Sequence, residues 1–138
     1  MTEARSYKKP LPTIDALNRP FWENAQAGRF VLQTCAKCLH VSYPPNPMCP
    51  KCLSTELEWR QASGRGVLKS WAVFHRAYWP AFEGDLPYTV CLVRLEEGPI
   101  FITNFANGMK SVPTVGASAH VVFEPVTEEI TLPQFSLD

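Results

Sequence analysis

The sequence lacks an excess of charge of either sign, and it lacks a long hydrophobic run. Its 138 residues include 13 Lys and Arg against 13 Asp and Glu, so the formal net charge at pH 7 is zero. This balance argues against a chain whose main task is to neutralise phosphates, because such proteins usually have a basic surface. The most apolar stretch, TVCLVRL, is interrupted by Arg94, and the N-terminus has charges where a signal peptide is apolar. We therefore expect a soluble, cytoplasmic protein that does not contact a membrane.

Catalytic motifs are also missing. The chain has no G-x-S-x-G, Walker loop, GxGxxG or H-E-x-x-H sequence. His75 and His120 have no carboxylate or nucleophile at the spacing of an acid–base pair. We therefore assign no catalytic residue and predict that the chain is not an enzyme by itself.

The sequence does contain a cluster of cysteines. Four of its five cysteines form two C-x-x-C pairs, Cys35 with Cys38 and Cys49 with Cys52, and ten residues separate the pairs. Each pair can fold as a tight knuckle that directs two sulfurs to one point, and two knuckles supply the four thiolates of a tetrahedral zinc site. The proline-rich link at residues 43–47 is expected to stiffen the return of the second knuckle.

Other roles for these cysteines remain to be weighed. Disulfides are disfavoured because cytosolic thiols stay reduced, and a thioredoxin-like motif needs a C-x-x-C pair that opens a helix. A one-iron rubredoxin-type centre uses the same ligands, so spacing does not separate iron from zinc. Because protein sulfur fills all four positions, we expect a structural metal, with Lys37 and Lys51 offsetting part of the thiolate charge. The fifth cysteine, Cys91, is predicted to be a buried apolar residue.

The first 28 residues are predicted to form short helices. Thr13 or Asn18 is a candidate cap, Pro20 is expected to open a second helix, and Gly28 is expected to end it. The aromatic residues of this segment, Phe21 and Trp22, are expected to pack against the neighbouring lobe, with a partner-binding helix as the alternative. The apolar residues at helical spacing are Ile14, Leu17, Phe21, Trp22 and Ala25.

The rest of the chain is predicted to be mainly β. Short strands at 30–32 and 57–59 flank the knuckles and make a ribbon. Beyond Gly64 the apolar pattern has a period of two, and five short strands without a convincing helix indicate a small closed barrel of the OB-fold type. We therefore divide the chain into a helical segment at 1–28, a rubredoxin-like zinc ribbon at 29–63 and an OB-fold barrel at 64–138. The barrel strands are predicted at 67–74, 88–95, 100–105, 119–124 and 130–135.

Within the first barrel strand, the alternation assigns each side chain to one of two faces. Val67, Trp71 and Val73 are placed on one face. Leu68, Ala72 and Phe74 are placed on the other face, with Lys69 and Ser70 as polar interruptions.

This ordered combination of helices, ribbon and barrel resembles a known family of acyl-CoA-associated proteins, long described as a domain of unknown function. The resemblance spans nearly the whole chain. The sequence departs from the usual knuckle at Leu39 and Leu53, where glycine is common. Besides the four paired cysteines, the likeness is carried by Pro87-Tyr88, Glu97-Gly98, Val115-Gly116 and Phe123-Glu124.

The resemblance implies a non-catalytic accessory subunit in a hetero-oligomer. Family members associate with thiolase-like enzymes, including lipid-transfer thiolases and the retro-aldolases of steroid side-chain degradation, or with hot-dog-fold hydratases. It also implies that such a subunit stabilises its partner or helps to admit acyl-CoA.

Two competing functions belong to other classes. Ribbons and OB-folds both bind single-stranded nucleic acid, which needs a positive groove. Residues 1–66 carry nine basic and five acidic side chains, a net of plus four, whereas residues 67–138 carry four basic and eight acidic ones, a net of minus four. An acidic barrel repels a nucleic-acid strand, so this function is disfavoured. A free-standing acyl-CoA-binding protein remains an alternative and predicts a stable monomer.

The segment 75–85 is the predicted binding element of the barrel. It places Tyr78, Trp79 and Phe82 in a loop, with Arg76 as the nearest group for a phosphate or an acidic partner. These aromatic side chains either cover the open end of the barrel or bind a partner. Our hypothesis is that the loop docks on a thiolase-like subunit.

Overall fold

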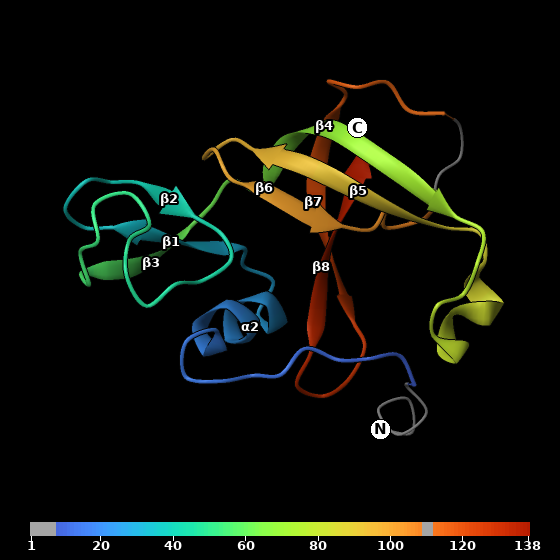
Figure 1. The fold of residues 1–138 in the computed structure, drawn as a ribbon, viewed down its shortest axis with the longest axis horizontal. Coiled ribbons are helices and arrows are strands. Elements are labelled where there is room, and N and C mark those ends of the chain that lie inside the picture. The colour runs from blue at the N-terminus through green and yellow to red at the C-terminus, as the bar shows by residue number, and fades with distance from the viewer. Residues whose placement is uncertain (1–7, 109–111) are drawn as a thin grey trace.

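The computed structural model describes residues 8–108 and 112–138, and they form two sheets with short helices (Figure 1). The small sheet and its long loops lie at one end of the longest axis, and the larger sheet occupies the rest. No helix in the described residues is long and apolar enough to cross a bilayer. The elements are α2 (Arg19–Gln26), β1 (Val31–Cys35), β2 (Val41–Ser42), β3 (Leu57–Gln61), β4 (Arg65–Phe74), η1 (Pro80–Asp85), β5 (Tyr88–Leu95), β6 (Ile100–Thr103), β7 (Ser118–Pro125) and β8 (Thr131–Leu137).

Helix α2 begins later than the apolar stripe predicts. The backbone N–H of Asp15 donates to Asn18 Oδ1 at 2.9 Å, and the N–H of Asn18 donates to Asp15 Oδ1 at 2.8 Å. This reciprocal pair fixes a turn, because short polar side chains compete with the helix for backbone groups. Ile14 and Leu17 therefore precede the helix, whereas the predicted helix with Pro20 in its first turn is confirmed.

The first sheet is an antiparallel ribbon with the strand order β2-β1-β3. Strand β1 is buried along its whole length and ends at Cys35, so it carries the chain directly into the first knuckle. Strand β3 leads away from the second knuckle, as the pattern predicts. The two-residue strand β2 was not predicted, because a strand of this length has no periodicity to detect.

The second sheet has the order β6-β5-β4-β7-β8, with antiparallel neighbours throughout. Its two outer strands approach each other through a parallel bridge between Phe105 and Phe135. The N–H of Ala106 donates to the carbonyl of Phe135 at 2.8 Å, and the N–H of Phe135 donates to the carbonyl of Asn104 at 3.2 Å. The five predicted strands therefore curl into a partly closed barrel, which confirms the OB-fold.

The faces predicted for β4 are wrong beyond Lys69. The pairing of β4 with β5 shifts by one residue between Leu68 and Ser70, which marks a β-bulge. Because side chains alternate along a strand, one extra residue exchanges the two faces of everything that follows. Trp71 and Val73 consequently share the inner face with Leu68. The side chains left on the outer side of β4 are Arg65, Val67, Lys69, Ser70, Ala72 and Phe74.

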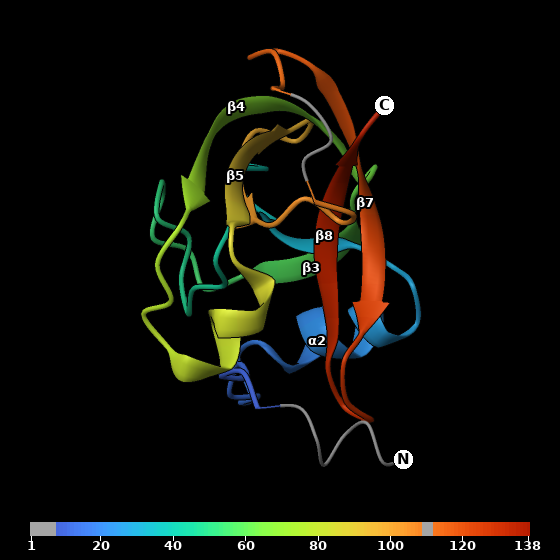
Figure 2. The same ribbon diagram turned by 90° about the vertical axis from the view of Figure 1, so that its right-hand side faces the viewer.

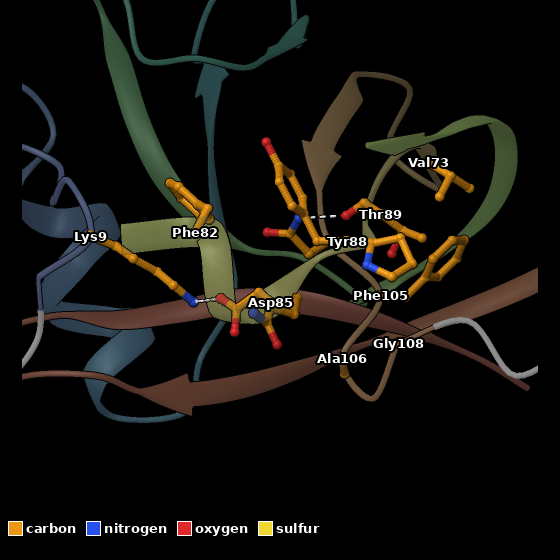
Figure 3. Close-up of a pocket in the computed structure, with 12 residues that line it drawn as sticks. Lys9, Val73, Phe82, Asp85, Tyr88, Thr89, Phe105, Ala106 and Gly108 are labelled. Atoms are coloured by element: carbon orange, nitrogen blue, oxygen red, sulfur yellow. Dashed lines mark hydrogen bonds and ion pairs between the residues drawn. The ribbon is translucent and has the colours of Figure 1, made fainter. Parts of the chain in front are cut away.

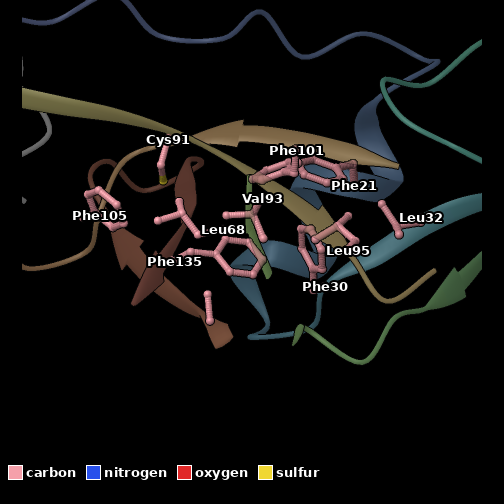
Figure 4. Close-up of a cluster of buried hydrophobic side chains, with 11 residues drawn as sticks. Phe21, Phe30, Leu32, Leu68, Cys91, Val93, Leu95, Phe101, Phe105 and Phe135 are labelled. Atoms are coloured by element: carbon pink, nitrogen blue, oxygen red, sulfur yellow. The ribbon is translucent and has the colours of Figure 1, made fainter. Parts of the chain in front are cut away.

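One hydrophobic core joins the helix, the ribbon and the barrel (Figure 4). Phe21 of α2 packs against Phe30 of the ribbon with ring centroids 6.1 Å apart, and it also contacts Phe101 of β6. Phe30 in turn lies 5.2 Å from Phe101 and 6.0 Å from Phe135. The predicted packing of Phe21 and Trp22 against the neighbouring lobe is confirmed. Buried side chains thus cross both of the predicted domain boundaries.

Helix α2 also contacts β7, β8 and the connection between these two strands. Figure 2 shows β7 and β8 side by side, with α2 close to the end where their connection lies. The side-chain amide of Gln26 donates to the carbonyl of Glu128 in that connection. At the junction of the two sheets, the N–H of Ser63 donates to the carboxylate of Glu97 at 2.8 Å, and the N–H of Val121 donates to the carbonyl of Gly64 at 2.7 Å. These contacts hold the ribbon and the barrel in one arrangement.

Candidate metal centre and binding loop

Four sulfurs converge between the two knuckles, and they come from Cys35, Cys38, Cys49 and Cys52. All four lie within 4.8 Å of one another, and the Cys35–Cys52 and Cys38–Cys49 sulfur pairs are each 3.6 Å apart. A tetrahedral zinc ion with bonds of about 2.3 Å separates its sulfur ligands by about 3.8 Å. The predicted cysteines therefore fit a four-coordinate metal without rearrangement of the backbone.

The two knuckles repeat the same backbone geometry. The N–H of Leu39 donates to the carbonyl of Cys35, and the N–H of Leu53 donates to the carbonyl of Cys49, both at 2.9 Å. Leu39 and Leu53 each have a φ of 65°, which is the left-handed conformation that glycine adopts most easily. The departure from glycine therefore leaves the knuckle shape intact. Both leucine side chains stay largely exposed, at 61% and 68%.

Backbone N–H groups stabilise some of the thiolates. The N–H of Cys38 donates to the sulfur of Cys35 at 3.4 Å and lowers the pKa of Cys35 to about 6. The N–H of Cys52 donates to the sulfur of Cys49 at 3.5 Å. At Cys52 the backbone N–H of Ser54 also favours the thiolate, but burial and the neighbouring sulfurs outweigh it and raise the pKa to about 12. Four sulfurs at this spacing need a cation to be ionised together.

The ligand set is enclosed by the protein on most sides. Cys35 and Cys49 are buried, and Cys52 is the ligand nearest to solvent. Lys37 lies beside the knuckles, but its ammonium group pairs with the carboxylate of Glu56 at 3.2 Å, so only part of its charge offsets the thiolates. His40 contributes its backbone carbonyl, which accepts the N–H of Cys35 at 2.9 Å. The arrangement suits a metal that holds the ribbon together.

The predicted binding loop lies at the opposite end of the long axis from the knuckles (Figure 1). Tyr78 and Trp79 are 70% and 51% exposed, and the guanidinium of Arg76 lies 5.2 Å from the centre of the Tyr78 ring. Phe82 belongs to η1 and turns the other way, because its ring packs 5.2 Å from that of Tyr88. Of the four predicted residues, Arg76, Tyr78 and Trp79 thus face solvent, whereas Phe82 supports the loop.

Phe82 also lines a pocket of about 400 Å³ at the mouth of the barrel (Figure 3). Lys9 forms an ion pair with Asp85, and its ammonium lies 5.2 Å from the centre of the Phe82 ring. On the other side, the amide of Asn104 donates to the carbonyl of Thr89 at 2.6 Å. Sequence reasoning missed Lys9, Asp85 and Asn104, since no motif spacing links residues so far apart in the chain.

A rubredoxin-like ribbon with four convergent cysteines, packed on an OB-fold barrel, defines the class of this protein. Residues 22–58 match the profile of the ChsH2 rubredoxin-like zinc ribbon domain, and residues 59–124 match that of the ChsH2 C-terminal OB-fold domain. The chain belongs to the ChsH2 family, whose members are also described as DUF35 proteins.

Three relatives place the chain within this family. A solved structure described as "Ltp2-ChsH2(DUF35) aldolase" contains a chain that is 35% identical, with a TM-score of 0.81, and the match covers 92% of this chain and 98% of that one. A "Probable enoyl-CoA hydratase alpha subunit" of Thermomonospora curvata is 35% identical over 127 residues, or 92% of this chain, which spans only 39% of that relative's length. A "DUF35 domain-containing scaffold protein" of Methanocaldococcus jannaschii is 30% identical over 96 residues, which are 69% of this chain and 67% of that protein.

Proposed function

We propose that this chain is a non-catalytic accessory subunit that binds and stabilises a thiolase-like acyl-CoA enzyme. The observation that carries this proposal is the near full-length match to the ChsH2(DUF35) chain of an aldolase, at 35% identity. The name of the archaeal relative, a scaffold protein, supports the same role. The partner is then a lipid-transfer-type thiolase or a retro-aldolase, with steroid side chains as a candidate substrate class and assisted entry of acyl-CoA as a candidate task.

A hydratase partner is the second candidate. The relative from Thermomonospora curvata is named as an enoyl-CoA hydratase alpha subunit, and it aligns with 92% of this chain. The same accessory role then serves a different reaction of an acyl-CoA substrate. Recovery of a hydratase subunit in place of a thiolase-like one decides between the two.

We further propose that the metal is structural zinc, with iron as the alternative. Four sulfurs at tetrahedral spacing support this assignment. Such a set leaves no coordination position for water or substrate, so the metal holds the ribbon and takes no part in a reaction. Elemental analysis of purified protein distinguishes zinc from iron directly.

The loop at 75–85 is proposed to contact the partner subunit through Arg76, Tyr78 and Trp79. Exposed aromatic and arginine side chains are the residue types that contribute most to protein interfaces. Phe82 supports the loop from beneath by packing on Tyr88. In this arrangement a partner meets a surface that is already formed and needs little reordering.

Co-expression with candidate partners tests the proposal. We expect the chain to copurify with a thiolase-like or hydratase subunit from the same genome as a stable hetero-oligomer. Trp79→Ala should weaken that association at least tenfold, whereas Leu53→Ala, an exposed apolar change at the other end of the molecule, should leave it unchanged. A monomer that binds acyl-CoA alone, or recovery of RNA-binding proteins only, overturns the proposal.

A further inference from the structure

The outer side of β4, β5 and β6 is an apolar surface. On β5 the buried side chains of Cys91, Val93 and Leu95 face the barrel interior, so the residues between them face outward. On β6 the buried Phe101 leaves Ile102 outward, with 62% of its surface exposed. We call this surface the outer sheet face. Its apolar members are Val67, Ala72, Val90, Leu92, Ile100 and Ile102.

These side chains are contiguous across the three strands. In the strand register, Leu92 of β5 lies opposite Ile102 of β6, and Val90 lies opposite Ala72 of β4. Arg94 lies opposite Ile100 on one side. Directly opposed residues on the same face of an antiparallel pair are in contact range, so the members form one patch rather than scattered residues. Contiguous exposed apolar surface of this kind marks sites of association.

The charge on this face has one sign. Strands β4, β5 and β6 contain no acidic residue, although residues 67–138 carry eight. Their charged side chains are Lys69 on the bulge of β4, Arg94 on β5 and Arg65 at the start of β4, and all three are exposed. Arg65 is paired with Asp138, so Lys69 and Arg94 carry the charge of the face. The outer sheet face is therefore cationic within a barrel segment whose net charge is minus four. A partner surface with carboxylates around an apolar centre is its electrostatic complement.

The outer sheet face is continuous with the binding loop. Phe74 and Tyr88, the last outward pair of β4 and β5, stack with ring centroids 5.0 Å apart and an angle of 7° between the planes. Tyr78 of the loop then meets Phe74 edge-on at 6.3 Å. The aromatic rings thus extend the patch from the strands to the exposed loop. One surface runs along the barrel from Ile100 to Tyr78.

We propose that the outer sheet face is the main docking surface for the partner subunit, which meets it with an apolar patch edged by carboxylates. This inference rests on the proposed function and adds the surface and the chemistry of the contact. The strands present aliphatic side chains at the centre of the patch, where a strand of nucleic acid needs aromatic rings for base stacking. The face therefore favours a protein partner over a nucleic acid. The loop at 75–85 is then the edge of the interface.

Charge insertion at the centre of the patch tests this assignment. Ile102→Glu places a carboxylate on an exposed position, so the fold and the metal content should be preserved. We expect the affinity for the partner to fall at least a hundredfold, because the carboxylate is buried without a counter-ion in the complex. Leu53→Glu, at an exposed leucine of the second knuckle, is the matched control and should bind as the wild type does.

A second variant tests the charge argument. Arg94→Glu should weaken the complex and reduce the dependence of its affinity on salt, whereas Arg94→Lys should retain most of the affinity. Equal binding by the wild type and Ile102→Glu overturns the assignment of the face while the proposed function stands. Failure of the wild type to bind either enzyme class overturns the proposed function itself. If the wild type binds single-stranded oligonucleotides but no protein partner, and Arg94→Glu abolishes that binding, both the proposed function and the assignment of the face are overturned.

Discussion

The imidazole Nδ1 of His120 lies 2.6 Å from a carboxylate oxygen of Asp138, which ties the residue after β8 to β7. The guanidinium of Arg65 on β4 holds the other carboxylate oxygen at 2.7 Å. One side chain thereby connects three neighbouring strands of the barrel. The hydrogen bond from His120, aided by the charge of Arg65, holds the pKa of Asp138 below its ordinary value.

This lowered pKa predicts a pH-dependent contribution to stability. A carboxyl group with a native pKa below its unfolded value of about 3.9 stabilises the fold above that pH and loses its contribution as the pH falls through the native value. Asp138→Asn should therefore lower the urea midpoint at pH 7, and the gap from the wild type should narrow below about pH 4. Metal release in acid affects both proteins and cancels in the difference. A gap that stays constant with pH contradicts this assignment.

The left-handed leucines predict a stabilising substitution. The left-handed conformation costs a non-glycine residue roughly 1–2 kcal/mol, and part of this is returned when glycine makes the unfolded chain more flexible. Leu53→Gly should therefore raise the free energy of unfolding by about 0.5–1 kcal/mol. Leu53→Ala keeps the strained backbone and serves as the control. Chemical denaturation at fixed zinc measures both, and a destabilised Leu53→Gly protein would show that the side chain contributes more than the strain costs.

Close packing at Gly66 predicts a position that tolerates no side chain. A Cβ at this residue would lie 2.5 Å from the carbonyl oxygen of Arg94 and 2.6 Å from a methyl of Val93. Gly66→Ala should thus destabilise the barrel by about 1–3 kcal/mol, as over-packed cores do. Gly84→Ala is the control, since a Cβ there meets nothing within 4 Å and the backbone has no positive φ. Thermal unfolding of the two variants gives the comparison.

Metal removal is expected to affect more than the ribbon. Structural zinc contributes on the order of 10 kcal/mol of binding free energy coupled to folding. Because Phe30 of the ribbon packs on Phe101 and Phe135 of the barrel, a strong chelator should loosen the barrel core together with the knuckles. Cys49→Ser should lose the bound metal, whereas Cys91→Ala should retain about one equivalent per chain. Tryptophan fluorescence and metal analysis report the two effects, and a barrel unchanged after metal loss would contradict the coupling.

Much of the fold follows from the sequence because its signals are local. The two C-x-x-C pairs specify their own knuckles, and the strand from Tyr88 to Leu95 has the predicted bounds because Pro87 precedes its apolar run and a Glu-Glu-Gly turn follows it. The bulge at Lys69 could not be foreseen, since it depends on how β4 pairs with β5. The turn made by Asp15 and Asn18 is also local, but its side chains compete with an apolar stripe that points to a helix.

The binding elements were harder to predict because they are assembled from distant segments. Tyr78 and Trp79 stand out in the sequence as aromatic residues in a loop. The outer sheet face has no such signal, because Leu92 and Ile102 become neighbours only through strand pairing. The pairing of Lys9 with Asp85 at the pocket likewise depends on the path of the chain. Predicting these surfaces requires knowledge of how the strands pair, and the apolar periodicity of the sequence does not give that strand register.

The aromatic contacts between ribbon and barrel determine where the chain can be cut. A fragment that begins at residue 64 keeps all five barrel strands but loses Phe21 and Phe30, which cover Phe101 and Phe135. Its interior would then open to water at one end, and the exposed rings would favour aggregation. The ribbon and helix thus cover one end of the barrel core, so loss of the metal that we propose for the ribbon should also expose that core to water.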